Sequence, residues 1–181
     1  MIKKGIILSG GHGTRMSPLT KAVNKQLLPI YDKPLIYYSL STLMLAKIKD
    51  ILIIVNKGQT NLYKKILKNG ENLGIKIQYK EQSYPKGIPD AFILGKKFIG
   101  RYNVALILGD NFFYSKSLAK KLLNATKIKS GAKVFLHRVR KPEKYGVAKV
   151  KKNKILSIKE KPKKFFSDFA ITGLYFFDNK V

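Results

Sequence analysis

The residues that could do chemistry begin with a glycine-rich loop near the N-terminus. Residues 9 to 15 read Ser-Gly-Gly-His-Gly-Thr-Arg, with glycine at positions 10, 11 and 13. Glycines let a backbone approach a ligand closely and point its N–H groups at an anion. A plain turn between a strand and a helix is the alternative. Because Arg15 adds a positive charge to the loop, the sequence favours phosphate binding.

Two familiar nucleotide-binding motifs do not fit this loop. A P-loop needs Gly-Lys-Ser/Thr after four spacer residues, whereas Gly13 is followed by Thr14 and Arg15. The dinucleotide fingerprint needs its third glycine where Met16 stands. The loop therefore predicts contact with phosphate without assigning the chain to either of these classes.

Two charged residues stand next to apolar runs further along the chain. Lys25 precedes residues 26–29, Gln-Leu-Leu-Pro, and Asp110 follows residues 106–109, Leu-Ile-Leu-Gly. Taken alone, Lys25 is typical of a surface lysine. Asp110 fits an Asx-turn or a helix cap as well as it fits an oxygen ligand for Mg²⁺, which prefers one or two carboxylates plus substrate phosphates. The residues by themselves leave these alternatives open.

The elements that must position these residues follow from the hydrophobic pattern. Apolar runs predict buried strands at 6–8, 51–55, 75–79 and 104–108. Helical stretches lie between and after them, at 34–47, 59–69, 89–98 and 118–128. This alternation predicts an α/β fold with a Rossmann-like, mainly parallel sheet flanked by helices. Strand-like segments at 132–139, 147–150, 155–158 and 170–177 predict antiparallel edge strands in the C-terminal third.

Length and fold class together place the site. The chain of 181 residues predicts one domain over 1–181. In an open sheet of this kind ligands bind beyond the carboxyl ends of the strands. We therefore expect the site in three loops, which follow Leu8, Tyr79 and Leu108.

Composition excludes several classes of function. There is no cysteine, which removes disulfides, thiolate metal sites and cysteine nucleophiles, and the only histidines are His12 and His137. No apolar run reaches the length of a membrane span, and the N-terminus does not read as a secretory signal, so a cytoplasmic protein is expected. The net charge is +27, but only four of the 37 basic residues are arginine. Because the lysines are scattered along the chain, they are better explained as a general bias of its amino-acid composition, on a solvated surface, than as a specific binding site for nucleic acid.

Five segments, taken in order, resemble a known family. They read Gly-Gly-His-Gly-Thr-Arg from 10, Lys-Gln-Leu-Leu-Pro-Ile-Tyr-Asp-Lys-Pro from 25, Gly-Asp-Asn-Phe-Phe-Tyr from 109, Glu-Lys-Pro from 160 and Thr-Gly-Leu-Tyr from 172. The chain resembles the sugar-1-phosphate nucleotidyltransferases over residues 4–181. The likeness is to members that transfer a thymidylyl group from dTTP to glucose 1-phosphate with Mg²⁺, giving dTDP-glucose for deoxysugar synthesis.

The resemblance implies a role for each matching residue. It implies nucleotide binding by Gly10, Gly11, Gly13, Thr14, Arg15, Lys25, Gln26, Gln82 and Gly87. Within this set, Arg15 and Lys25 would act on the reacting phosphates, and Gln82 and Gly87 on the thymine edge. Asp110 matches a magnesium ligand. Sugar-phosphate binding is implied for Tyr145, Gly146, Glu160 and Lys161.

The chain departs from the family pattern at several positions. Lys86 stands where an acidic residue is common, Pro89-Asp90 replaces Ala-Gln, and Phe165-Phe166 replaces Pro-Lys. The family chain continues past residue 181 and supplies a second magnesium aspartate there, so we expect impaired activity. The alternatives are a related enzyme that uses UTP or another hexose phosphate, and a non-catalytic nucleotide-binding remnant. The resemblance implies a homo-oligomer of the family type, and the missing C-terminal part counts against it.

Overall fold

Four parallel strands form the centre of the larger of two units in this chain. The computed structural model describes residues 1–11, 13 and 16–180. The larger unit comprises Met1–Lys133 and the residues from Phe176 onward, and the smaller comprises Val134–Tyr175. The central strands are β1 (Lys4–Ser9), β4 (Asp50–Asn56), β5 (Lys76–Gln82) and β6 (Val104–Leu108). They lie in the order β5-β4-β1-β6, and β10 (Phe169–Phe177) follows β6.

The register brings the carboxyl ends of these strands level. Ser9 is paired with Val55, Leu8 with Leu108, and Asn56 with Gln82. Strands in a parallel sheet are covered on both faces, so they read as continuous apolar runs rather than alternating ones. In agreement, Ile6 and Ile7 of β1 are both fully buried. Each such side chain contributes about 1.5–3 kcal/mol by leaving water.

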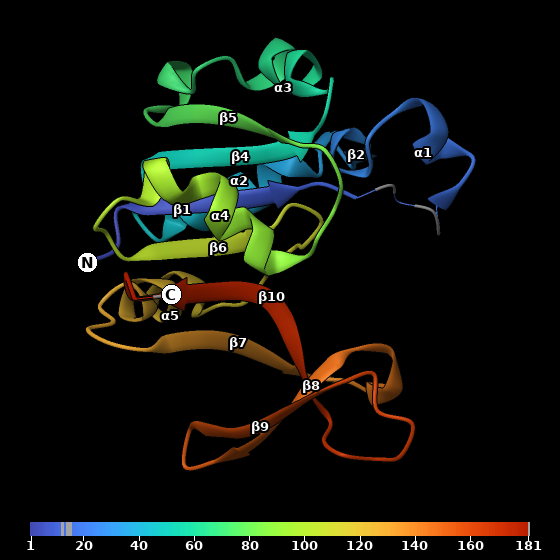
Figure 1. Cartoon of the computed structure of the whole chain (residues 1–181), viewed down its shortest axis with the longest axis vertical. Coiled ribbons are helices and arrows are strands. Elements are labelled where there is room, and N and C mark those ends of the chain that lie inside the picture. Colours follow the sequence, from blue (N-terminus) through green and yellow to red (C-terminus); the bar gives the residue numbers. More distant parts are fainter. Residues whose placement is uncertain (12, 14–15, 181) are drawn as a thin grey trace. The chain divides into compact units, whose positions relative to one another are not determined.

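Helices flank this sheet as the sequence predicts. They are α2 (Ile36–Leu45), α3 (Thr60–Leu67), α4 (Ile88–Ile99) and α5 (Leu118–Ala125). Figure 1 shows α4 crossing the near face of the sheet, with α2 behind it. The Rossmann-like class and the predicted strands and helices are confirmed, with ends that differ by at most three residues.

The segment between β1 and α2 differs from expectation. It contains the short helix α1 (Leu19–Ala22), a 3-10 turn at Lys25–Leu27, and a small hairpin of β2 (Pro29–Ile30) and β3 (Lys33–Pro34). The sequence predicted a helix from Pro34, but Pro34 pairs with Pro29 in this hairpin, and the helix begins at Ile36. Elements of two to four residues carry too few apolar positions to be seen by periodicity.

The smaller unit is built from antiparallel pairing. Its strands are β7 (Ala132–Arg138), β8 (Gly146–Lys151) and β9 (Lys154–Glu160), together with most of β10, and a 3-10 turn lies at Pro142–Lys144. β8 and β9 form a hairpin, and β10 pairs with β8 through Ala170 and Val147. Lys152 and Asn153 join the hairpin with φ of 46° and 61°, as a two-residue turn of the mirror-image type requires.

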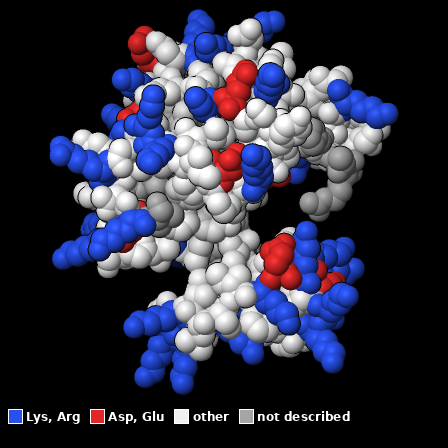
Figure 2. Space-filling model, in the orientation of Figure 1, with Lys and Arg blue, Asp and Glu red and all other residues white. Residues whose placement is uncertain are grey.

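Two observations concern the surface. Lysine and arginine side chains are scattered over the face seen in Figure 2, with a few acidic groups among them. No helix in the part of the chain that the structure describes is long and apolar enough to cross a membrane.

Candidate active site

The candidate site lies at the carboxyl edge of the parallel sheet. Ser9 ends β1, Asn56 ends β4, Gln82 ends β5 and Leu108 ends β6. The loops that follow three of these strands are those in which the sequence predicts the site, although β5 runs three residues further than expected. The edge therefore brings together the glycine loop, the loop that follows Gln82 and the turn with Asp110.

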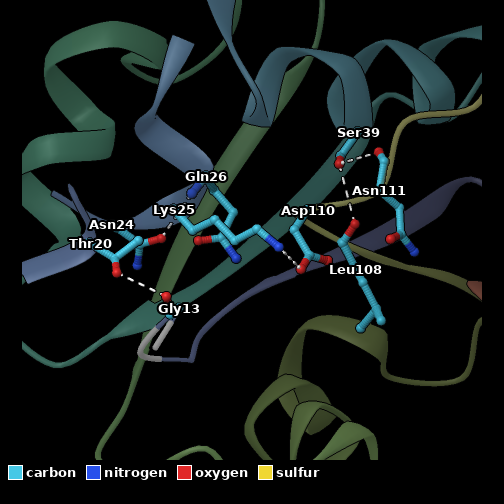
Figure 3. Close-up of polar contacts among 9 residues, drawn as sticks. All are labelled: Gly13, Thr20, Asn24, Lys25, Gln26, Ser39, Leu108, Asp110 and Asn111. Carbon is cyan, nitrogen blue, oxygen red and sulfur yellow. Dashed lines mark hydrogen bonds and ion pairs between the residues drawn. The ribbon is translucent and has the colours of Figure 1, made fainter. Parts of the chain in front are cut away.

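Lys25 and Asp110 meet at this edge. The Nζ atom of Lys25 lies 2.8 Å from Oδ2 of Asp110, and the two side chains are 31% and 33% exposed (Figure 3). A partly exposed ion pair contributes only about 0.2–1 kcal/mol to stability. The pair can therefore open at low cost, which would free the ammonium group for a phosphate and the carboxylate for a cation.

Asn24 holds the 3-10 turn that presents Lys25. Its Oδ1 accepts a hydrogen bond from the backbone N–H of Gln26 at 3.1 Å. Its Nδ2 donates to Oε1 of Gln59 at 2.6 Å and to the carbonyl of Ser9 at 3.4 Å. One amide side chain thus ties the lysine-bearing turn to the end of β1 and to the start of α3.

Ser39 performs a similar task for the turn that carries Asp110. Its hydroxyl, buried on α2, lies 3.3 Å from the carbonyl oxygens of both Leu108 and Asn111 and is shared between them (Figure 3). The backbone N–H of Asn111 also donates to Leu108 at 3.2 Å. Asp110 therefore stands in a turn that is fixed from both sides.

At two positions of the glycine loop a larger residue would have to displace a neighbouring side chain. A Cβ built on Gly10 would lie 1.4 Å from Nε2 of Gln82, and one built on Gly13 would lie 2.8 Å from Cγ2 of Thr20. The Thr20 hydroxyl also donates to the Gly13 carbonyl at 2.9 Å. Gly11 instead faces open space, with φ of +102°. The predicted phosphate contacts of Thr14 and Arg15, and His12 between the glycines, lie outside the described residues.

Two buried polar atoms beside Gly109 have no hydrogen-bond partner among the described residues. They are Oγ of Ser9 and Oε1 of Gln26, whose residues are 0% and 4% exposed. A Cβ on Gly109 would lie 2.3 Å from the Ser9 hydroxyl oxygen and 3.1 Å from Cγ of Gln26. Unpaired polar atoms are costly inside a protein, and such atoms are expected where a ligand or ordered water completes a site. Gln26, a predicted nucleotide-binding residue, thus has a free amide oxygen beside Gly109, and its contact with nucleotide stays a prediction.

The predicted base-side residues lie at the end of β5 and after it. Gln82 is 3% exposed, and its Nε2 donates to Oδ1 of Asn56 at 3.3 Å. Gly87 has φ of +88° and precedes α4, whose first turn contains Pro89. The left-handed backbone at Gly87 explains why glycine stands there.

The four predicted sugar-phosphate residues come together within the smaller unit. Gly146 is paired with Glu160 across the hairpin, and the backbone N–H of Lys161 donates to the carbonyl of Tyr145 at 3.0 Å. Lys161 Nζ lies 3.8 Å from Oε1 of Glu160. A Cβ on Gly146 would come within 2.7 Å of the Glu160 carboxylate. Burial, and then the negative charge of Glu160, raises the pKa of Tyr175 in the same unit.

Sequence reasoning missed three residues whose side chains position the others, namely Asn24, Ser39 and Asn56. None belongs to a motif by itself, and their roles depend on contacts with distant backbone atoms. Asn56 could have been found, because it is a polar residue directly after a buried strand.

Three comparisons bear on this geometry. A model of the nucleotidyl transferase family matches residues 4–181. A glucose-1-phosphate thymidylyltransferase of Neisseria meningitidis is 51% identical over 179 residues, which are 98% of this chain and 62% of that protein. One from Xanthomonas campestris pv. campestris is 49% identical over 180 residues, with 99% of this chain and 61% of that protein covered. The chain therefore spans about three fifths of these relatives.

Solved structures of related enzymes have the same fold. A Bacillus anthracis protein assigned as a glucose-1-phosphate thymidylyltransferase, crystallised with sucrose, superposes with a TM-score of 0.91. It is 40% identical, over 98% of this chain and 72% of that chain. A UDP-glucose pyrophosphorylase with bound UDP-glucose superposes with a TM-score of 0.80 and 28% identity, over 98% of this chain and 76% of the other.

Proposed function

This chain belongs to the nucleotidyl transferase family, and we propose that it transfers the thymidylyl group of dTTP to glucose 1-phosphate, giving dTDP-glucose and pyrophosphate. The observation that carries the proposal is the Lys25–Asp110 pair beside the glycine loop, at the carboxyl edge of the sheet. The names of the relatives in Neisseria and Xanthomonas support the choice of substrates. We place the reaction in the cytoplasm, where nucleoside triphosphates are made.

The reaction needs positioning and charge neutralisation rather than a covalent enzyme intermediate. A phosphate oxygen of glucose 1-phosphate forms a bond to the α-phosphorus of dTTP. The bond from that phosphorus to the oxygen that bridges to the β-phosphate breaks, and pyrophosphate leaves. Lys25 would neutralise the reacting phosphate, and the backbone of Gly10, Gly11 and Gly13, with Thr14 and Arg15, would hold the triphosphate.

The residues present fit Mg²⁺ that arrives with the nucleotide. No cluster of three metal-binding side chains occurs in residues 1–11, 13 and 16–180. Asp110 supplies one carboxylate, and Mg²⁺ typically takes one or two carboxylates with phosphates and water. When bound, the ion would supply positive charge to the triphosphate. Asp110 would orient it from a turn fixed by Ser39.

We assign the sugar phosphate to the smaller unit and the base to the end of β5. Lys161 would pair with the phosphate of glucose 1-phosphate, and Glu160 would accept hydrogen bonds from the sugar hydroxyls. Gln82 and Gly87 would contact the thymine edge. We also keep the prediction that residues 1–181 form one nucleotidyltransferase domain.

The experiment is a titration followed by a turnover assay on the same chain. Calorimetry should detect binding of dTTP in the presence of Mg²⁺, with weaker binding of inorganic tripolyphosphate because it lacks a base. Equal affinity for both ligands would leave only attraction to the positive charge of +27 and would overturn the proposal. Pyrophosphate release from dTTP plus glucose 1-phosphate, lost in Asp110→Ala, would establish catalysis.

A second candidate uses UTP in place of dTTP. The likeness to UDP-glucose pyrophosphorylase favours it. Thymine and uracil differ by one methyl group, and a methyl-sized difference in a pocket typically gives about 10- to 200-fold discrimination. Titration with dTTP and UTP in parallel decides between the two, and tighter binding of UTP would select this candidate.

A further inference from the structure

Asn56, at the end of β4, makes two hydrogen bonds to the glycine loop. Its Oδ1 accepts a hydrogen bond from the backbone N–H of Gly11 at 3.1 Å, and its Nδ2 donates to the carbonyl of the same residue at 3.1 Å. The Oδ1 atom also accepts from Nε2 of Gln82 at 3.3 Å. We infer that Asn56 is a positioning residue that couples the phosphate-binding loop to the base-binding residue Gln82. This inference rests on the proposed function.

The two bonds to Gly11 select one backbone conformation. Gly11 has φ of +102°, and no atom lies within 4 Å of a Cβ built on it. Glycine can adopt this conformation, but it also visits many others at similar cost. A side-chain amide that pairs with both the N–H and the C=O of Gly11 removes that freedom before a ligand arrives. Binding of a triphosphate would then pay less of the ordering entropy.

The third bond fixes the amide of Gln82. Asn56 and Gln82 are paired on neighbouring strands, so the two side chains stand next to each other at the same edge. An amide can rotate to exchange its oxygen and nitrogen. The Oδ1 atom of Asn56 can only accept a hydrogen bond, so the group of Gln82 that faces it must be the Nε2 amide. The Oε1 atom of Gln82 therefore lies on the other side of that amide.

Gly10 completes the coupling through packing. A Cβ on Gly10 would overlap Nε2 of Gln82 at 1.4 Å, so the loop backbone lies directly against the Gln82 amide. Gln82 is thus held by the loop on one side and by Asn56 on another. A shift of the loop would move the base-binding group, and a shift of that group would move the loop.

A general contribution to stability is the alternative reading, and Asn103 offers a matched control. Asn103 precedes β6 at the opposite edge of the sheet. Its Nδ2 donates to the carbonyl of Ile128 at 3.2 Å, and its Oδ1 accepts from the backbone N–H of Asn179 at 3.1 Å. It therefore ties backbone segments together as Asn56 does, but away from the site.

The test is calorimetric titration of the 181-residue chain with dTTP and Mg²⁺, with melting temperatures measured alongside. Asn56→Ala and Asn103→Ala should both lower the melting temperature. Only Asn56→Ala should weaken dTTP, on the order of tenfold, as expected for loss of hydrogen bonds that organise the site. A Gln82→Ala variant and the double variant complete a cycle. If Asn56 acts in part through Gln82, the double variant should lose less affinity than the product of the two single losses.

The outcomes separate this inference from the proposed function. A wild-type chain that binds no dTTP would overturn the proposed function itself. Wild-type binding with equal affinity losses in Asn56→Ala and Asn103→Ala would show a purely structural asparagine. Losses that multiply in the double variant would show that Asn56 and Gln82 act independently, which would also overturn the coupling.

Discussion

The Nζ of Lys25 lies 2.8 Å from Oδ2 of Asp110, although 85 positions separate the two residues in sequence. Each group satisfies the other in the absence of ligand, and each is proposed to contact a different ligand group when nucleotide binds. The pair therefore holds both charges in place until a phosphate and a cation replace them.

Removal of Asp110 should have opposite effects with and without metal. In EDTA, Asp110→Ala should bind dTTP as tightly as wild type or more tightly, because Lys25 is no longer paired. With Mg²⁺, the variant should lose a metal-dependent gain on the order of tenfold, the scale of a charge-assisted contact. Calorimetry in the two buffers measures both effects. Asp32→Ala, which removes an exposed pair with Lys33 at 3.0 Å, is the control and should change neither.

A methyl group at Gly10 should damage binding more than stability explains. Gly10→Ala must displace the amide of Gln82, since its Cβ would lie 1.4 Å from Nε2. We expect at least a tenfold loss of dTTP affinity, with a lower melting temperature. In Gly5→Ala the new Cβ would meet Leu43 Cδ1 at 2.8 Å, within the core. That control should lower the melting temperature alone. Comparable affinity losses in the two variants would refute the proposed contact.

Two lysines of the smaller unit provide a matched pair for sugar-phosphate binding. Lys161 and Lys152 both have left-handed backbone, with φ of 40° and 46°, so alanine is strained to a similar degree at either position. Lys161→Ala should weaken glucose 1-phosphate about tenfold or more, because it removes a cation proposed to face the phosphate. Lys152→Ala should have little effect. Titration with glucose 1-phosphate measures both, and similar losses would contradict the assignment of Lys161.

The stability of the larger unit should depend on the charge of Asp178 at low pH. The carboxylate accepts hydrogen bonds from the backbone N–H groups of Gly131 at 2.6 Å and Lys180 at 3.0 Å, and these lower its pKa. A lowered folded-state pKa adds stability that is present above the unfolded pKa of about 3.9 and lost as pH falls through the folded value. Asp178→Ala should therefore melt lower than wild type at pH 7.

The pH dependence of that difference is the measurement. The gap in melting temperature should stay constant from about pH 7 to 5 and narrow below about pH 4, as the wild-type carboxylate takes up a proton. If the difference in melting temperature stays unchanged through acid pH, the charge of the Asp178 carboxylate does not stabilise the unit through its hydrogen bonds to Gly131 and Lys180.

The strands and helices of the parallel unit could be predicted because their physics is local and repetitive. The run at 104–108 matches β6 at both ends, and Pro89 lies in the first turn of α4 as expected. The positions of Lys25 and Asp110 relative to each other could not be derived from spacing. The 3-10 turn that presents Lys25 depends on Asn24, which contacts Gln59 from another element. Such contacts leave no period in the sequence.

The site residues also fall into those that a local sequence pattern indicates and those that depend on contacts between distant residues. Gly10 and Asp110 could be proposed from the sequence because they belong to segments with a recognisable order. Asn56 and Ser39 were not, because each acts on the backbone of a residue far away in sequence. A single polar residue in an apolar run has many roles open to it, and only the pairing of strands selects one.

The central place of β1 in the sheet has a consequence for synthesis on the ribosome. β1 is made first, yet it lies between β4 and β6, and Lys4 is paired with both Asp50 and Val104. At about 5–20 residues per second, roughly 5–20 s must pass between translation of β1 and of its second neighbour. During that interval β1 lacks its partner β6, and Ile6, which ends fully buried, first lacks the helix α4, whose Gly95 lies against it. The nascent chain is therefore expected to engage chaperones through its first strand until β6 has emerged.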